Sequence, residues 1–275
     1  MAAMPQRPPR KGWWLAAGIA GLAAVIATTA AAWSNPSASR PPVQIAAKPE
    51  PALVAAALPL AGKVIGIDPG HNGGNFNDPG YINSSVWNGR AWETCDTTGT
   101  ETDGGYTEAQ YNFRVAQFLR ADLIRAGAHV VMTRTSNRGV GPCVNRRAQI
   151  IDNAHANVAV DIHADGGPPS GRGFTILEPV PDGPNNKVIG SSDRFAADLR
   201  SAFLKGTPMP LSSYDGVNGF TKRDDLAGLN LTTVPKVLIE CGNMRNATDA
   251  RMLTATWFQE AAARAMTAAI IRFLH

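Results

Sequence analysis

Short apolar runs alternate with segments of helical periodicity along most of the chain, and this alternation constrains the fold more than any other feature. Five runs have the length and composition of buried strands: Val64–Ile67, His129–Met132, Val158–Ile162, Phe174–Leu177 and Val234–Ile239. Apolar residues at helical spacing predict helices over residues 108–126, 145–155, 191–204 and 249–274. This order predicts a single α/β domain with a mainly parallel, twisted sheet and helices on both faces.

Side chains that can bind metal ions lie at or near the ends of these strands. His71 follows the first strand, His163 ends the third, and Glu240 directly follows the last. Glu108 begins a helix after a loop long enough to return to the same edge. Because ligands in such sheets bind beyond the carboxyl ends of the strands, we expect the four side chains to meet there. Two imidazoles and a carboxylate suit Zn²⁺ and leave a position for water, while a further glutamate can act as general base.

Each of these residues also has a purely structural explanation. The two histidines can be ordinary turn or core residues, and Glu108 can be a carboxylate favoured by a helix N-terminus. Glu240 can form a salt bridge with Arg134 or Arg147, because a carboxylate that ends an apolar run is costly to bury unpaired. Their shared placement at one sheet edge favours the metal site, with one zinc ion as the expected cofactor.

Three further side chains are candidates for supporting the metal ligands. Asp68 lies three residues before His71 and is expected to orient it through the ring nitrogen that faces away from the metal. Arg134 and Asp161, near the ends of the second and third strands, are the other two candidates.

The first 61 residues differ in composition from the rest of the chain. Basic residues followed by an Ala-rich apolar run from Trp13 to Trp33 predict a secretory signal peptide over residues 1–33. The length of this run leaves an uncleaved membrane anchor as the alternative. Residues 34–61 are rich in Pro and Ala and predict an extended linker. The folded domain is expected over residues 62–275, in an exported protein.

The net charge of +4 comes from this leading segment. Five of the 26 basic residues and one of the 22 acidic residues precede residue 62, which leaves 21 of each in the remainder. The expected domain is therefore neutral, and nucleic acid is not an expected partner.

The chain contains three cysteines, an odd number for an exported protein. Cys95 and Cys143 lie in polar, Gly-rich loops that a covalent bond would hold in place, and we predict a disulfide between them. Cys241 follows the last apolar run and is expected to be a buried free thiol.

Two long segments, residues 72–106 and 206–230, separate the predicted elements. Structureless connections of this length are uncommon in compact domains and are often functional. Both segments would border the sheet edge that carries the metal-binding side chains, so we expect them to form the walls of a substrate groove. Trp87 and Trp92 in the first segment can stack on a sugar or pack the loop.

Taken in order, the motifs resemble those of the zinc-dependent N-acetylmuramoyl-L-alanine amidases of the amidase-3 type. The resemblance spans nearly the whole domain and rests on these matching pieces: Ile67–His71, Glu108 with Asn112, Val131–Arg134, Arg147, Asp161–Asp165, Pro235–Gly242 and Asn246.

The resemblance implies both an activity and an assignment of roles. His71, Glu108 and His163 would bind zinc, and Glu240 would be the catalytic carboxylate. The reaction would hydrolyse the amide between N-acetylmuramic acid and the L-alanine of the peptide stem, in peptidoglycan or in muropeptides. The protein would be periplasmic, associated with the cell wall or secreted, and is expected to be a monomer that contacts a membrane only if its N-terminal segment is uncleaved.

The chain departs from the family pattern at three positions near the site. Asp161 stands where serine is usual, Asp165 where asparagine is usual, and Asn243 where phenylalanine is common. None of these changes removes a ligand or the base. Two alternatives remain: a zinc peptidase or deacetylase that acts on another bond of the cell wall, and a non-catalytic wall-binding or regulatory domain.

Overall fold

A six-stranded sheet forms the centre of the computed structural model, which describes residues 58–275. Its strand order is β4-β1-β5-β8-β6-β7. The bounds are β1 Val64–Pro69, β4 His129–Met132, β5 Val158–Asp165, β6 Thr175–Pro179, β7 Phe220–Arg223 and β8 Lys236–Asn243. All neighbouring pairs are parallel except β6 and β8. The predicted α/β class with a mainly parallel sheet is confirmed.

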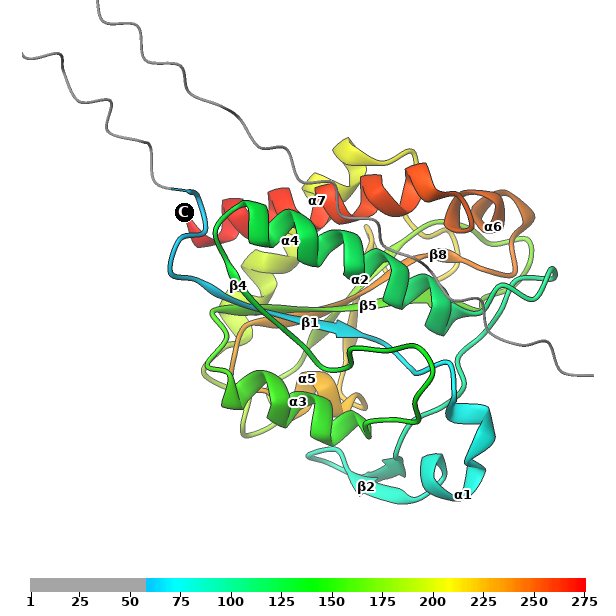
Figure 1. Cartoon of the computed structure of the whole chain (residues 1–275), viewed down its shortest axis with the longest axis horizontal. Helices are drawn as coiled ribbons and strands as arrows, with labels where there is room; N and C mark the ends of the chain where they lie inside the picture. The colour runs from blue at the N-terminus through cyan, green and yellow to red at the C-terminus, as the bar shows by residue number, and fades with distance from the viewer. Residues whose placement is uncertain (1–57) are drawn as a thin grey trace, which may run out of the picture. The chain divides into compact units, whose positions relative to one another are not determined.

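Helices cover both faces of this sheet (Figure 1). One layer contains α2 Glu108–Arg125, α4 Ile189–Gly206, α6 Ala247–Leu253 and α7 Thr256–Leu274, and the opposite layer contains α3 Val144–Asn153 and α5 Ala227–Asn230. Thr107 caps the start of α2 by accepting a hydrogen bond from the backbone N–H of Gln110. Gly127, with φ +97°, provides the left-handed residue that turns the chain from α2 toward β4.

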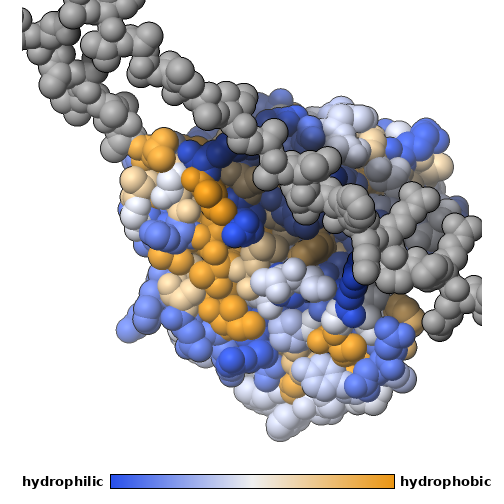
Figure 2. All heavy atoms as spheres, in the orientation of Figure 1, coloured by the Kyte–Doolittle hydropathy of each residue, from blue (hydrophilic) through white to orange (hydrophobic). Residues whose placement is uncertain are grey.

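The main hydrophobic core lies between the sheet and the layer that contains α2, α4 and α7. Val160 and Ile162 of β5 and Val237 and Ile239 of β8 are fully buried in it. The alternate residues of the same strands point to the other face, where the charged side chains lie. In Figure 2, hydrophobic side chains also form an exposed band over the area that edge strand β4 occupies in Figure 1.

Three sequence expectations about single elements differ from the structure. The closing helix is divided into α6 and α7, and the Gln259 side chain donates to the backbone carbonyl of Leu253 at the break. The segment expected as loop over residues 206–230 contains strand β7 and the short helix α5. The segment expected as loop over residues 72–106 contains a 3-10 turn at Asn75–Asn77, a short helix α1 at Pro79–Ile82, and a hairpin of β2 Ser85–Trp87 and β3 Trp92–Thr94. Short elements of this kind lack the periodicity on which the predictions depend.

The predicted signal peptide or anchor, residues 1–33, lies outside the described residues, as does most of the linker. The last residues of the predicted linker belong to the packed chain, since Leu60 is fully buried and its N–H donates to the carbonyl of Ala126. Among residues 58–275, no helix has the length and hydropathy that a membrane span requires.

The structure contains the predicted disulfide between Cys95 and Cys143, and Cys241 is a buried free thiol. The disulfide joins the long segment after β1 to the residue before α3. It therefore fixes this segment beside the sheet edge where the strands β1, β5 and β8 end.

Candidate active site

A cavity of about 390 Å³ opens at the carboxyl ends of β1, β5 and β8. His71, Glu108, His163 and Glu240 all line it, although they lie far apart in the sequence. Both long segments also contribute lining residues, for example Thr97 from the first and Arg223 from the second. The predicted walls of a groove are thus present around the four side chains.

Three of the four side chains form a cluster that can hold a metal ion. One ligand atom each from His71, Glu108 and His163 lies within 4.8 Å of the others. The Glu108 carboxylate lies between the two rings: its Oε1 is 2.8 Å from Nδ1 of His163, and its Oε2 is 3.3 Å from Nε2 of His71. The two imidazoles meet edge to face with centroids 4.9 Å apart. Nδ1 of His163 and Nε2 of His71 are therefore the nitrogens that would face a shared ion.

Local backbone geometry explains how these side chains approach so closely. His71 follows β1 in a left-handed conformation with φ +56°, which turns its side chain back toward the sheet edge. Gly99 has φ +71°, and a Cβ atom there would lie 2.6 Å from Oε2 of Glu108. Gly70 lies against the His163 ring with no room for a side chain. Both glycines leave space that the cluster needs.

The outer nitrogen of each histidine faces an aspartate. Nδ1 of His71 lies 3.1 Å from Oδ1 of Asp96, and Nε2 of His163 lies 3.3 Å from Oδ1 of Asp161. The expectation that Asp68 orients His71 is wrong, because Asp68 instead accepts hydrogen bonds from Thr133, Arg147 and Lys236.

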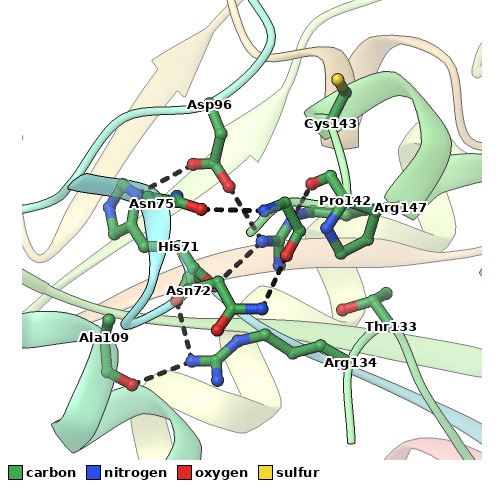
Figure 3. A network of polar contacts seen from close by, with 12 residues as sticks. His71, Asn72, Asn75, Asp96, Ala109, Thr133, Arg134, Pro142, Cys143 and Arg147 are labelled. Carbon is green, nitrogen blue, oxygen red and sulfur yellow. Dashed lines mark hydrogen bonds and ion pairs between the residues drawn. The ribbon is translucent and has the colours of Figure 1, made fainter. Parts of the chain in front are cut away.

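Asp96 was missed in the sequence because nothing in its local pattern marks it. The disulfide offers the one signal, since Asp96 follows Cys95 and the bond brings it beside the α3 residue Arg147. The guanidinium of Arg147 donates to Oδ2 of Asp96 at 2.9 Å and to the backbone carbonyl of His71 at 2.9 Å (Figure 3). Asp96 is thereby held in place from the side opposite His71.

Arg134, a predicted supporting residue, acts on the backbone rather than on a ligand side chain. Its guanidinium donates to the backbone carbonyls of Pro69 and Gly70. It also donates to the backbone carbonyl of Ala109 in α2 (Figure 3). These bonds tie the turn that precedes His71 to the first turn of the helix that carries Glu108. Arg134 thus fixes the relative position of two residues of the cluster.

Burial and mutual contact shift the pKa values of the cluster in opposite directions. Burial by itself would lower the pKa of His71, but Glu108 and Asp96 outweigh it and raise this pKa to about 9. Burial would raise the pKa of Glu108, but the two histidines hold it well below its usual range. Without a metal, Glu108 thus favours the protonated form of both histidines, and a cation that binds between them would displace these protons. Two imidazoles and a carboxylate are a donor set that fits Zn²⁺.

Glu240 completes the site from the neighbouring strand. In the pairing of β5 with β8 it lies opposite His163. Its Oε2 atom is buried and has no hydrogen-bond partner among the described residues, and burial raises the pKa of Glu240 to about 8. Neither Arg134 nor Arg147 forms the salt bridge considered as the structural alternative, because both are engaged at the end of β1.

Tyr214 is a second residue that the sequence did not single out. Its hydroxyl donates to Oδ2 of Asp165, which lines the cavity, at 2.8 Å. Its ring lies close against Gly167 and Gly171, where a side chain would collide with it. The segment after α4 is thus attached to the rim of the cavity. Trp87 and Trp92 are not cavity residues; they pair across the exposed hairpin with ring centroids 5.7 Å apart.

A fold of this kind, with two histidines and two glutamates in a cavity at the carboxyl edge of the sheet, indicates a hydrolase, and comparison with known families agrees. The model of the family Amidase_3, N-acetylmuramoyl-L-alanine amidase, matches residues 65–272. The chain belongs to this family.

Individual relatives support the same assignment. The chain is 37% identical over 235 residues to the N-acetylmuramoyl-L-alanine amidase Rv3717 of Mycobacterium tuberculosis. The matched residues cover 81% of this chain and 95% of the relative. The crystal structure of the amidase Ami1 of Mycobacterium smegmatis is similar with a TM-score of 0.74 and 36% identity, over 78% of this chain and 98% of that one. The apo form of Ami1 of Mycobacterium abscessus has the same TM-score and 38% identity, over 78% of this chain and all of the other. The family and its relatives support peptidoglycan amidase activity for this chain.

Proposed function

We propose that this chain is a zinc-dependent N-acetylmuramoyl-L-alanine amidase in which His71, Glu108 and His163 bind one zinc ion and Glu240 is the general base. The proposal rests on one observation above all: three ligand-type side chains converge within 4.8 Å, and an unpaired buried carboxylate lies across the sheet from one of them. Structural salt bridges would not require this arrangement.

A zinc ion at this site would polarise the scissile carbonyl and lower the pKa of a water molecule toward neutrality. Glu240 would take the proton of the attacking water and transfer it to the amine of the departing L-alanine. Burial suits Glu240 for this task, because a carboxylate whose pKa is raised to about 8 accepts and returns a proton more readily at neutral pH than an ordinary one.

The substrate of the proposed reaction is peptidoglycan or a muropeptide. The lactyl carbonyl would lie in the cavity beside the cluster, with the two long segments on either side of the bond. The Cys95–Cys143 disulfide supports an exported protein, since such bonds persist in oxidising compartments. Residues 1–33 would direct this export, and residues 34–61 would connect them to the catalytic domain. The protein would act as a monomer.

Mass spectrometry of muropeptides digested by the purified full chain tests the proposal. Release of a stem peptide with a free L-alanine amino terminus, abolished by a chelator and restored by zinc, is the expected result. Cleavage at a different amide bond would favour the peptidase or deacetylase alternative. Intact muropeptides beside a chain that binds no zinc would favour the non-catalytic alternative.

A further inference from the structure

A continuous series of buried charges connects the outer nitrogens of the two histidines beneath the cavity. Each neighbouring pair in it has an N···O distance of 3.5 Å or less. Its members, in order, are His71, Asp96, Arg147, Asp68, Lys236, Asp161 and His163. Between the two histidines, carboxylates and cations alternate along it. The His71 end appears in Figure 3, where Asp96 lies between the ring and Arg147.

Lys236 is the least expected member of this series. It is the first residue of β8 and is fully buried. Its Nζ lies 2.9 Å from Oδ2 of Asp68 and 3.5 Å from Oδ2 of Asp161. Because residues an even number of positions apart on a strand share a face, Lys236 projects from the same face of β8 as Glu240. Asp161 and His163 project from this face of the sheet on the neighbouring strand β5.

The backbone of α5 closes over this ion pair. A Cβ atom on Gly228 would lie 3.1 Å from Nζ of Lys236 and 3.4 Å from Oδ2 of Asp161. A larger residue would press on the pair, whereas glycine lets the helix cover it. A buried lysine is costly unless it is paired, so the position of Lys236 depends on the two aspartates.

Asp161 has one oxygen engaged and one available. Its Oδ2 faces Lys236, while its Oδ1 is buried without a hydrogen-bond partner among the described residues and lies 3.3 Å from Nε2 of His163. Nδ1 of the same ring faces Glu108. An N–H on Nε2 that donates to this free oxygen leaves the lone pair of Nδ1 directed at the cluster, which is the tautomer that a metal ligand needs.

We infer that Asp161 and Lys236 form a positioning pair for the ligand His163: Asp161 fixes the ring and its tautomer, and Lys236 holds Asp161 in place. The inference rests on the proposed metal site. Lys236 acts through Asp161 and touches neither substrate nor metal.

Zinc affinity of the purified full chain, measured by competition with a chromophoric chelator, tests the pair without reference to catalysis. Asp161→Asn keeps the shape of the side chain and removes its charge, and Lys236→Met keeps much of the length and removes the cation. Loss of a group that orients a metal ligand typically weakens metal binding about 10- to 100-fold, and we expect each variant to fall in that range. The absorption spectrum of the Co²⁺-loaded chain should change with it.

A double-mutant cycle separates this role from a purely structural one. If Lys236 acts through Asp161, the double variant should bind zinc no more weakly than the weaker single variant, because interacting residues are not additive. Additive losses would overturn the inference. Lys222→Met is the matched control, since Lys222 also pairs with two carboxylates but is half exposed and outside the cavity. It should leave zinc affinity unchanged.

Thermal unfolding of each variant identifies changes that only destabilise the chain. If Lys236→Met does not fold, Asp161→Asn still carries the test, because Lys236 then keeps its pair with Asp68. Folded Asp161→Asn with the zinc affinity and Co²⁺ spectrum of the parent would overturn the inference while leaving the proposed function standing. A parent chain that binds no zinc would overturn the proposed function itself.

Discussion

Glu240 lies directly opposite His163 in the parallel pairing of β5 and β8. This register brings a carboxylate beside the candidate metal cluster of His71, Glu108 and His163 without making it a member. The Oε2 atom of Glu240 has no hydrogen-bond partner among residues 58–275. A base must lie within reach of the water that it deprotonates yet remain free of the metal. The strand register places Glu240 where it would satisfy both requirements of the proposed mechanism.

Glu240→Gln should therefore keep zinc and lose turnover. Glutamine preserves the size of the side chain but cannot take a proton, and loss of a general base typically lowers the rate about 10²- to 10⁴-fold. Zinc content by atomic absorption and the rate of muropeptide cleavage measure the two effects. Glu260→Gln, an exposed change on α7, is the control and should alter neither. Full activity of the Glu240 variant would contradict the proposed mechanism.

His71→Ala and His163→Ala should lose both zinc and activity. Each change removes one of three ligand-type side chains, so bound zinc should fall well below one equivalent after dialysis against a weak chelator. His129→Ala is the matched control, because His129 is exposed at the start of β4 and lies outside the cluster. Retention of one zinc equivalent by either cluster variant would show that the ion binds elsewhere.

The sequence predicts the main architecture because long elements have a clear period. The helix that starts at Glu108 and the strands that end near His163 and Glu240 are located correctly to within a few residues. Since parallel strands end at a common edge, this also predicts which side chains meet. The convergence of the metal-type residues therefore follows from periodicity and topology together.

The supporting contacts could not be predicted in this way. Asp96 reaches His71 through a loop whose course depends on the disulfide, and Tyr214 reaches Asp165 through a second irregular segment. Asp68 was assigned to His71 by proximity in sequence, but its side chain points along the sheet face toward Lys236. Alternation along β8 places Lys236 on the face of Glu240, so this supporting contact does have a readable signal in the sequence.

Removal of the Cys95–Cys143 disulfide should destabilise the domain. The cysteines are 48 residues apart, and loss of a crosslink over a loop of this length corresponds to about 4 kcal/mol of chain entropy. Denaturant unfolding of the Cys95→Ser/Cys143→Ser double variant measures the loss. Alkylation of the unfolded parent without reductant should label Cys241 alone; labelling of all three thiols would contradict the disulfide.

Stability should fall in acid in part through Asp68. Burial would raise the pKa of this carboxyl, but Lys236 and Arg147 hold it well below its ordinary value. The stability that the Asp68 carboxylate contributes is thus fully present above its pKa of about 3.9 in the unfolded chain. This stability is lost as the pH falls toward the lower pKa of Asp68 in the folded chain. Asp68→Asn leaves two buried cations short of a partner and should cost about 3–5 kcal/mol at pH 7.

The quantity to follow is the gap in free energy of unfolding between the parent and Asp68→Asn. Urea unfolding at pH 7 and at successively lower pH should show this gap narrowing below about pH 4, because Asp68 of the unfolded parent then binds a proton that the folded chain excludes. Asp103→Asn, on an exposed aspartate paired only with Arg245, should show a small and nearly constant gap. A gap for Asp68→Asn that is independent of pH would contradict the assigned role.

Gly70→Ala should weaken metal binding although residue 70 is not a ligand. A Cβ atom at this position would overlap the His163 imidazole, so the ring must leave its present position beside Glu108. Since the backbone carbonyl of Gly70 is also held by Arg134 and Asn112, the turn cannot easily shift to make room. Zinc affinity should fall at least as much as in Asp161→Asn. Gly190→Ala in α4, where no atom lies within 4 Å of the new Cβ, should leave zinc affinity unchanged and alter stability by about 1 kcal/mol or less. Equal zinc affinities for the two alanine variants would contradict the close packing of Gly70 on His163.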